Sequence, residues 1–399
     1  MLRDVTEDVK QHYFDPLALD SGWKARVRAT IQEISKAGSM NEALSHIAAL
    51  LDSLNDSHTY FLPPARPYRH DYGFEMEMIG ERCFATRVRP GSDAARKGLK
   101  AGDEILTLDG YAPTRGDIWK MKDLFWKLQP QLSLKLAVRP AGGMVRRIEV
   151  DASIHQIAAG NDEAGDALFR SRRATESRQD SARPIYVERG NGLLIIRIPV
   201  LELSNSELSA LVHRMRRHSA VILDLRGDAG GSLTTLQELV GSVFAGKITI
   251  GEIVNSRTIS PMVAEPRGLV FPGKLAVLID GESTSAAEVF ARIMQIEGRG
   301  LVFGDKSAGR VMAARQYMHQ VGLARVVMYG AVVSEGEIRM ADGQSLEGNG
   351  VVPDRRILPS ASDLVSGRDP ALAAAAEALE VNLTPEEAGA VFPARWPER

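Results

Sequence analysis

The sequence predicts an α/β protein with an N-terminal helical segment, a β-rich domain and an α/β core with a mainly parallel sheet. Three observations predict it. Apolar residues recur at helical spacing up to about residue 60, strand and turn patterns fill residues 70–153, and short apolar runs then alternate with helical patterns. We expect these regions: 1–65, helical segment; 66–156, β-rich domain; 157–184, flexible linker; 185–360, core; 361–399, C-terminal helix and tail.

Composition and charge describe an ordinary folded protein. The chain has 399 residues, more than one core usually organises, with 44% hydrophobic and 25% charged residues. Its 49 Lys and Arg against 51 Asp and Glu give a net charge of -2, which argues against a nucleic-acid partner. The single cysteine, Cys83, cannot form an internal disulfide, and no Cys/His cluster has zinc-ligand spacing.

Membrane and export signals are missing from the sequence as given. No run approaches the roughly 20 apolar residues that span a bilayer. The first residues also lack the basic and apolar regions of a signal peptide. We therefore expect no membrane span. The location is left open: periplasmic or secreted if a signal peptide has been removed, and otherwise cytoplasmic.

The helical segment carries its apolar residues on one face, for example Ile47, Leu50, Leu51 and Leu54. The stretch 55–60 then breaks this spacing, and the prolines at 63, 64 and 67 are typical of an extended connector. We expect a domain boundary near residue 65.

The β-rich domain contains a distinctive stretch at 91–110, "GSDAARKGLKAGDEILTLDG". This stretch resembles a PDZ domain, in which a short helix precedes a Gly-Asp turn and a strand that ends in Asp-Gly. The resemblance places Tyr72, Gly73 and Phe74 where PDZ domains bind a peptide carboxylate through backbone N–H groups, while the peptide adds a strand to the sheet. The alternative is a module that binds no peptide and only packs or gates.

Buried strands and amphipathic helices alternate in the core. The apolar runs at 192–198, 220–225, 275–280 and 301–304 predict strands, and the patterns at 207–217, 233–244 and 285–297 predict helices. Two polar motifs follow the second and third of these strands. Ligand sites of open α/β sheets lie at the carboxyl ends of the strands, so we expect the site there.

The first motif is "DLRGDAGG" at 224–231. A glycine pair after a buried strand lets backbone N–H groups face a cavity, a geometry suited to an oxyanion hole at Gly230 and Gly231. By itself the pair would more often be a tight turn.

The second motif is "DGESTSAAE" at 280–288, where a strand gives way to a helix. A serine at a helix N-terminus lies where negative charge is favoured. Ser285 and Glu288 also have capping-box spacing, so capping alone would explain this serine.

Taken together, "LDLRGDAGG", "LIDGESTSAAEVFARIMQIEGRGLVFGDKSAG" and the late "EGNGVVPD" resemble the tail-specific, or C-terminal processing, serine peptidase family, which includes the tricorn core protease. The resemblance covers nearly the whole chain. It implies that Ser285 is the nucleophile. It also implies an oxyanion hole formed by the amide of Ala286 and that of Gly230 or Gly231.

One position departs from the better-known branch of this family, which uses a lysine base. Counting along "GDKSAGR" puts Arg310 at that position, and an arginine stays protonated and cannot act as a general base. Lys306 precedes it by four residues and would serve only if the loop had a different register. Arg310 is left as a residue that holds a substrate carboxylate, holds a loop, or lies on the surface.

The tricorn-like branch uses a histidine supplied from just before the PDZ domain. Here Ser57 and His58 resemble that pair in order and position, and Glu347 resembles the carboxylate that completes the relay. The resemblance implies that Ser285 attacks, His58 takes its proton, Ser57 bridges, and Glu347 holds the other imidazole nitrogen.

Two functions from different classes remain open on the sequence alone. The first is a serine endopeptidase that needs no metal or cofactor, acts on protein or peptide substrates and recognises them with its PDZ domain. The second is a non-catalytic peptide- or hydrophobic-ligand-binding protein on the same scaffold, because the family resemblance also reaches retinoid-binding members. Oligomerisation is left open. Covalent labelling by a fluorophosphonate, compared with Ser285→Ala, discriminates the two functions.

Overall fold

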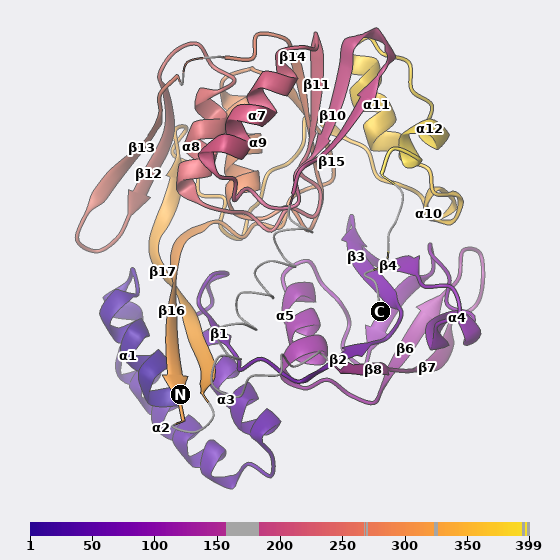
Figure 1. Cartoon of the computed structure of the whole chain (residues 1–399). Helices are drawn as coiled ribbons and strands as arrows, with labels where there is room; N and C mark the ends of the chain where they lie inside the picture. The colour runs from indigo at the N-terminus through magenta and orange to yellow at the C-terminus, as the bar shows by residue number, and fades with distance from the viewer. Residues whose placement is uncertain (157–182, 267, 269, 323–325, 393–395, 397–399) are drawn as a thin grey trace.

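The computed structural model describes residues 1–156, 183–266, 268, 270–322, 326–392 and 396. Figure 1 shows an α/β core at the top, the N-terminal helices at the lower left, and the β-rich domain at the lower right. The linker expected at 157–184 lies outside the described residues except for its last two.

Three helices form the N-terminal segment, as the apolar spacing predicts. The second helix, α2 (Ser21–Lys36), and the third, α3 (Met40–Asp52), are capped by Asp20 and Ser39. The side chains of these two N-cap residues accept N–H groups of the first turn. The buried faces include Leu44, Ile47 and Leu51. The helical elements are α1 (Leu2–His12), a 3₁₀ turn at Pro16–Ala18, α2 (Ser21–Lys36) and α3 (Met40–Asp52).

A short strand lies just before the boundary predicted near residue 65. β1 (Tyr60–Leu62) pairs antiparallel with β17 (Val327–Met340), so the stretch after α3 joins a sheet of the core. β17 also pairs with β16 (Met312–Val321). Figure 1 shows this long hairpin running from the core down to the N-terminal helices. The pairing fixes the 55–60 stretch, which carries the candidate histidine, against the core.

The β-rich domain is built on a five-stranded antiparallel sheet in the order β3-β4-β5-β6-β7, with β3 at one edge. A second, two-stranded sheet pairs β2 with β8. Alternating burial along β3 and β6 gives the domain its own apolar core. Its strands are β2 (Tyr68–Asp71), β3 (Phe74–Ile79), β4 (Arg82–Val88), β5 (Glu104–Leu108), β6 (Ser133–Arg139), β7 (Arg146–Asp151) and β8 (Ser153–Gln156). Its helices are α4 (Asp93–Arg96), α5 (Ile118–Asp123) and a π-helical turn at Leu124–Leu128.

The core sheet has the order β18-β15-β14-β11-β10-β9 and is parallel except for β9. This confirms the mainly parallel sheet that the buried apolar runs predict. The strands are β9 (Ile185–Arg189), β10 (Leu193–Arg197), β11 (Ala220–Asp224), β14 (Lys274–Ile279), β15 (Leu301–Gly304) and β18 (Arg355–Arg356). The predicted helices are present as α7 (Asn205–Met215), α8 (Leu233–Gly241) and α9 (Ala286–Ile296), and a 3₁₀ turn spans Gly190–Gly192.

A second sheet of the core, not expected from the sequence, has the order β1-β17-β12-β13 with β16 on β17. Its remaining strands are β12 (Ile248–Val254) and β13 (Ile259–Ala264). The described part of the C-terminal region contains three helices, where the sequence indicated one: α10 (Ala361–Ser366), α11 (Pro370–Ala378) and α12 (Pro385–Gly389). Within the described residues, no helix is long and apolar enough to cross a membrane.

Candidate active site

Ser285 lies at the junction between β14 and α9, where it is the N-cap residue of the helix. Its backbone angles are φ 54° and ψ -119°. A residue other than glycine in this region is strained, and such strain gathers at functional sites. The sequence predicts the helix N-terminus but not this conformation, which presents the serine on a sharp turn.

Glu288 organises the backbone around Ser285. The carboxylate is fully buried and accepts hydrogen bonds from the amide of Ser285 (3.0 Å), from the amides of Gly309 and Arg310 (2.7 and 2.9 Å) and from the Ser307 hydroxyl (2.6 Å). Burial raises the pKa of Glu288 to about 7. The capping-box spacing is therefore used, and the same carboxylate also holds the 307–310 loop, which the sequence did not indicate.

Asp56 fixes the backbone of the candidate histidine. Its Oδ1 accepts the N–H groups of His58 (2.9 Å) and Thr59 (2.8 Å), as in an Asx turn. The Ser334 hydroxyl on β17 donates to the same oxygen at 2.6 Å. The turn is thus anchored both to itself and to the long hairpin.

Ser57, His58 and Glu347 form a chain of hydrogen bonds, although Glu347 is 290 residues from Ser57. Ser57 Oγ lies 2.7 Å from His58 Nδ1 and donates to Glu347 Oε2 at 2.8 Å. A hydroxyl has one proton, so with that proton on the carboxylate side it accepts from Nδ1–H. This leaves Nε2 as the basic nitrogen. Glu347 thus acts on the imidazole through Ser57, whereas we expected it to hold the ring nitrogen itself.

The backbone of Ser285 and the chain of hydrogen bonds through Glu347 both contact the loop that contains Arg310 and Val311. The Ser285 amide donates to Arg310 O at 2.8 Å, and the next amide, that of Val311, donates to Glu347 Oε2 at 2.7 Å. Arg310 also donates from its guanidinium to Ser57 O at 3.0 Å. No hydrogen bond joins the side chains of His58 and Ser285 in the described part of the chain.

The charge environment keeps His58 neutral. Burial, and then the positive charge of Arg310, lower the pKa of His58 to about 4, and Asp56 opposes this shift weakly. A neutral imidazole at pH 7 can accept a proton, as a general base must.

The two glycines differ in what their amides do. Gly230 donates its N–H to Asp228 Oδ1 at 2.7 Å, whereas the amides of Gly231 and Ala286 donate no hydrogen bond among the described residues. A Cβ added at Gly230 would lie 2.6 Å from Ser285 Cβ, so this backbone packs against the serine. Of the two glycines that the sequence left open, Gly231 has the free donor.

Arg310 is a loop-holding residue and not a surface one. Its guanidinium stacks on Trp119 of α5, with 4.1 Å from Cζ to the ring centroid. Burial lowers the pKa of the Arg310 guanidinium below its usual range. Arg310, Trp119, Ser57 and Glu347 line a cavity of about 180 Å³, and Lys306 lies on the same wall. No hydrogen bond joins Lys306 to Ser285 among the described residues.

The proposed carboxylate-binding loop differs from expectation. Tyr72 is buried, with its hydroxyl donating to Gln131 O at 2.8 Å. Gly73, expected to offer an open N–H, donates it to Asp71 Oδ1 at 2.9 Å. Phe74 is buried in the apolar core of the domain. The glycine is nevertheless required, because a Cβ there would lie 2.3 Å from Ser92 Cβ.

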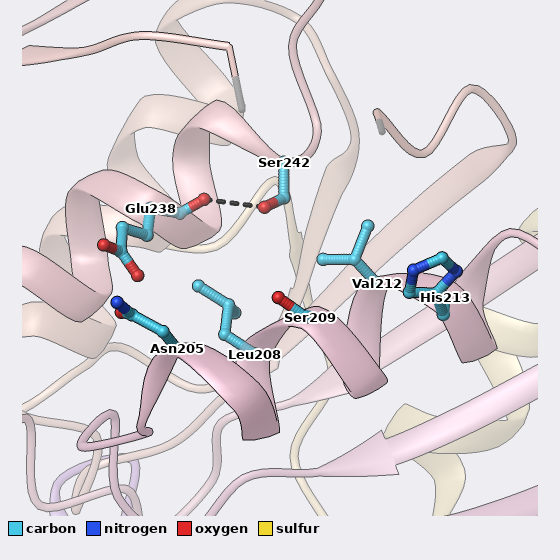
Figure 2. Close-up of a pocket in the computed structure, with 7 residues that line it drawn as sticks. All are labelled: Asn205, Leu208, Ser209, Val212, His213, Glu238 and Ser242. Carbon is cyan, nitrogen blue, oxygen red and sulfur yellow. Dashed lines mark hydrogen bonds between the residues drawn. The ribbon is translucent and has the colours of Figure 1, made fainter. Parts of the chain in front are cut away.

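A separate cavity of about 200 Å³ lies between α7 and α8. Figure 2 shows residues of the two helices lining it, with the Ser242 hydroxyl donating to the backbone oxygen of Glu238 at 2.7 Å. None of the four relay residues lines this cavity. We assign no role to it.

A strained serine at a helix N-terminus, free amides beside it and a histidine held by a hydroxyl and a carboxylate define the class of serine hydrolases. Residues 192–357 match the family described as Peptidase family S41. This part of the chain is therefore similar to a family of peptidases, and the chain is similar in sequence to tail-specific and C-terminal processing peptidases.

Two curated proteins and one solved structure illustrate this similarity. The tail-specific protease of Haemophilus influenzae is 27% identical over 281 residues, which is 64% of this chain and 36% of that protein. The chloroplastic carboxyl-terminal-processing peptidase 3 of Arabidopsis thaliana is 20% identical over 318 residues, 76% of this chain and 59% of that protein. The chain thus matches less than two thirds of the length of either relative. The crystal structure of mature CPAF shares the fold, with a TM-score of 0.64, 13% identity, and coverage of 91% of this chain and 93% of that one.

Proposed function

We propose that the chain is an endopeptidase in which Ser285 is the nucleophile and His58 the general base. Nε2 of His58 takes the serine proton as Ser285 attacks the scissile carbonyl, and Ser57 and Glu347 stabilise the imidazolium that forms. The amides of Gly231 and Ala286 stabilise the oxyanion. The observation that carries this proposal is the chain of hydrogen bonds through Glu347, Ser57 and His58. This chain and the backbone of Ser285 both bond to the two residues at 310–311.

The missing hydrogen bond between His58 and Ser285 is compatible with this mechanism. Catalytic hydrogen bonds often tighten only when substrate binds, so an unliganded site need not show them. Both side chains lie on segments held by Arg310, whose guanidinium contacts Ser57 O and whose carbonyl accepts the Ser285 amide. We expect a movement of this loop on substrate binding to bring His58 to the nucleophile.

The β-rich domain is proposed to recognise substrate tails. β3 is an edge strand, so an extended peptide can pair with its outer side. The far end of β3 reaches the core: Gly80 donates its amide to Asp305 at 2.8 Å, and a Cβ at Gly281 would lie 3.2 Å from Met78 O. A peptide antiparallel to β3, with its carboxylate near Gly73, would therefore run upstream toward the Ser285 loop.

Hydrolysis of an unfolded protein tests the catalytic assignment. Ser285→Ala and His58→Ala should each lower kcat by about a thousandfold or more, and the double variant should be little worse, because the residues act as one unit. His213→Ala, at an exposed histidine of α7, is the matched control and should keep full activity. Undiminished turnover by His58→Ala would overturn the histidine scheme.

Tail recognition is tested with two substrates that differ only at the carboxyl end. A long peptide with a free apolar terminus should have a KM about tenfold or more below that of its amidated twin, with similar kcat. This comparison leaves the protein unchanged, which matters because Gly73→Val would clash with Ser92. Equal KM values would rule out carboxylate recognition.

A fluorophosphonate that labels nothing would instead favour the non-catalytic binding protein.

A further inference from the structure

Asp228 is a buried carboxyl group in the glycine loop, beside the proposed oxyanion hole. Its exposed fraction is 0%. Oδ1 accepts the amide of Gly230 at 2.7 Å, while Oδ2 is buried and has no hydrogen-bond partner among the described residues. A buried carboxyl oxygen without a donor costs stability if it is charged.

Asp228 also joins the glycine loop to the nucleophile loop. Its backbone oxygen accepts the amide of Thr284 at 2.9 Å and the Thr284 hydroxyl at 3.3 Å. Thr284 immediately precedes Ser285, and the backbone of Gly230 packs against Ser285. The residue thus fixes the distance between the free Gly231 amide and the serine.

The charged groups nearby give Asp228 no partner. From the β14–α9 loop it faces Asp280, a half-buried carboxyl group whose negative charge disfavours a charge on Asp228. Arg226 on its own loop donates to Asp224 and Asp369. Glu282 is paired with Lys122 of α5 at 2.8 Å. The titratable groups of the neighbouring site, Glu288, Arg310 and His58, are each engaged in the contacts described above.

We propose that Asp228 is a positioning residue of the oxyanion-binding loop and that it acts as a neutral carboxylic acid. The proposal rests on the proposed peptidase function, because it gives Asp228 its role through the Gly230–Gly231 amides. The neutral acid keeps an acceptor for Gly230, and so orients the next peptide, without adding negative charge where the oxyanion develops.

A pH dependence follows from this role. Burial raises the pKa of Asp228 to about 8, although the backbone N–H groups of Gly230 and Leu201 oppose the shift, and Asp280 adds to it. Above that pH the group carries a negative charge beside the oxyanion site and opposes transition-state formation. The kcat/KM of the wild type should therefore fall about tenfold or more between about pH 7 and about pH 9.5.

Two substitutions at this position separate charge from shape. Asp228→Asn keeps an oxygen for the Gly230 amide and cannot ionise, so its kcat/KM at pH 7 should exceed that of Asp228→Ala about tenfold or more and should lack the alkaline decline of the wild type. Asp228→Ala removes the acceptor and should lower kcat about 10- to 100-fold at every pH, with KM little changed. Asp20→Asn, at the exposed cap of α2, is the matched control and should keep the wild-type profile.

A measurement independent of catalysis completes the test. The folded pKa lies above the unfolded one, so wild-type stability should fall relative to Asp228→Asn as pH rises from about 4 to about 8, and then run parallel. Parallel unfolding midpoints throughout, or an unchanged alkaline decline in Asp228→Asn, would overturn the proposal. If the wild type neither hydrolyses peptides nor reacts with a fluorophosphonate while the stability contrast persists, the proposed function fails and the catalytic role of Asp228 fails with it.

Discussion

Removing the Ser57 hydroxyl tests the least familiar part of the proposed relay. Ser57→Ala deletes the contacts to His58 Nδ1 (2.7 Å) and Glu347 Oε2 (2.8 Å) and leaves the Ser57 amide on Glu347 Oε1 at 2.8 Å. A hydrogen bond to a charged group contributes about 1.5–3 kcal/mol. If the imidazolium loses that support in the transition state, kcat should fall about 10- to 150-fold, since 1.36 kcal/mol is a factor of ten.

The assay is kcat and KM for a short chromogenic peptide, with the unfolding midpoint measured in parallel. Ser57→Thr retains a hydroxyl and should recover most of the activity. Ser53→Ala is the control, because the Ser53 hydroxyl donates to a backbone oxygen at the end of α3 and should not affect kcat. Wild-type kcat in Ser57→Ala, or a loss confined to stability, would refute the relay through Ser57.

Three further predictions follow from the same contacts. Gly231→Ala would place a Cβ 1.9 Å from Leu201 O, so the loop must shift and kcat should fall about a hundredfold, whereas Gly246→Ala, which meets open space, should leave the kinetics unchanged. Arg310→Gln removes a positive charge that lowers the pKa of His58, so the acid limb of kcat/KM should move to higher pH; an unmoved limb would show that Arg310 does not act on His58. Asp224 is fully buried; burial alone would raise its pKa, but Arg197 and Arg226 hold that pKa below the usual range. The pairing should therefore stabilise the fold above about pH 4 and weaken as pH falls. Asp224→Asn should destabilise the protein by about 3–5 kcal/mol in denaturant unfolding at pH 7, and a loss under about 1 kcal/mol would contradict this.

The strands and helices of the core could be predicted because their signal is local. The buried strands β10, β11 and β14 are continuous apolar runs, and the amphipathic helices between them repeat at helical spacing. The β16–β17 hairpin could not be predicted in this way. β16 is mostly exposed, so it has no alternation of burial, and β1 is too short to be recognised without its distant partner.

The features of the candidate site that could be predicted were likewise those with a local sequence signal. Motif resemblance indicated Ser285, His58 and Glu347, but spacing alone would not, since these residues come from distant segments and meet only through Ser57 and the backbone of the 310–311 loop. The positive φ of Ser285 and the second role of Glu288 depend on tertiary contacts with the 307–310 loop. Gly73 shows the same limit: the resemblance predicted an open backbone N–H there, but whether that N–H was open depended on the side chain of Asp71.

The most direct test of the account is the labelling of the intact chain by a fluorophosphonate, with the modified residue located by mass spectrometry. If Ser285 is the nucleophile and His58 its base, we expect one adduct, on Ser285. The rate of labelling should fall about a hundredfold or more in His58→Ala and stay unchanged in His213→Ala. An adduct elsewhere, or equal labelling of the wild type and His58→Ala, would contradict it.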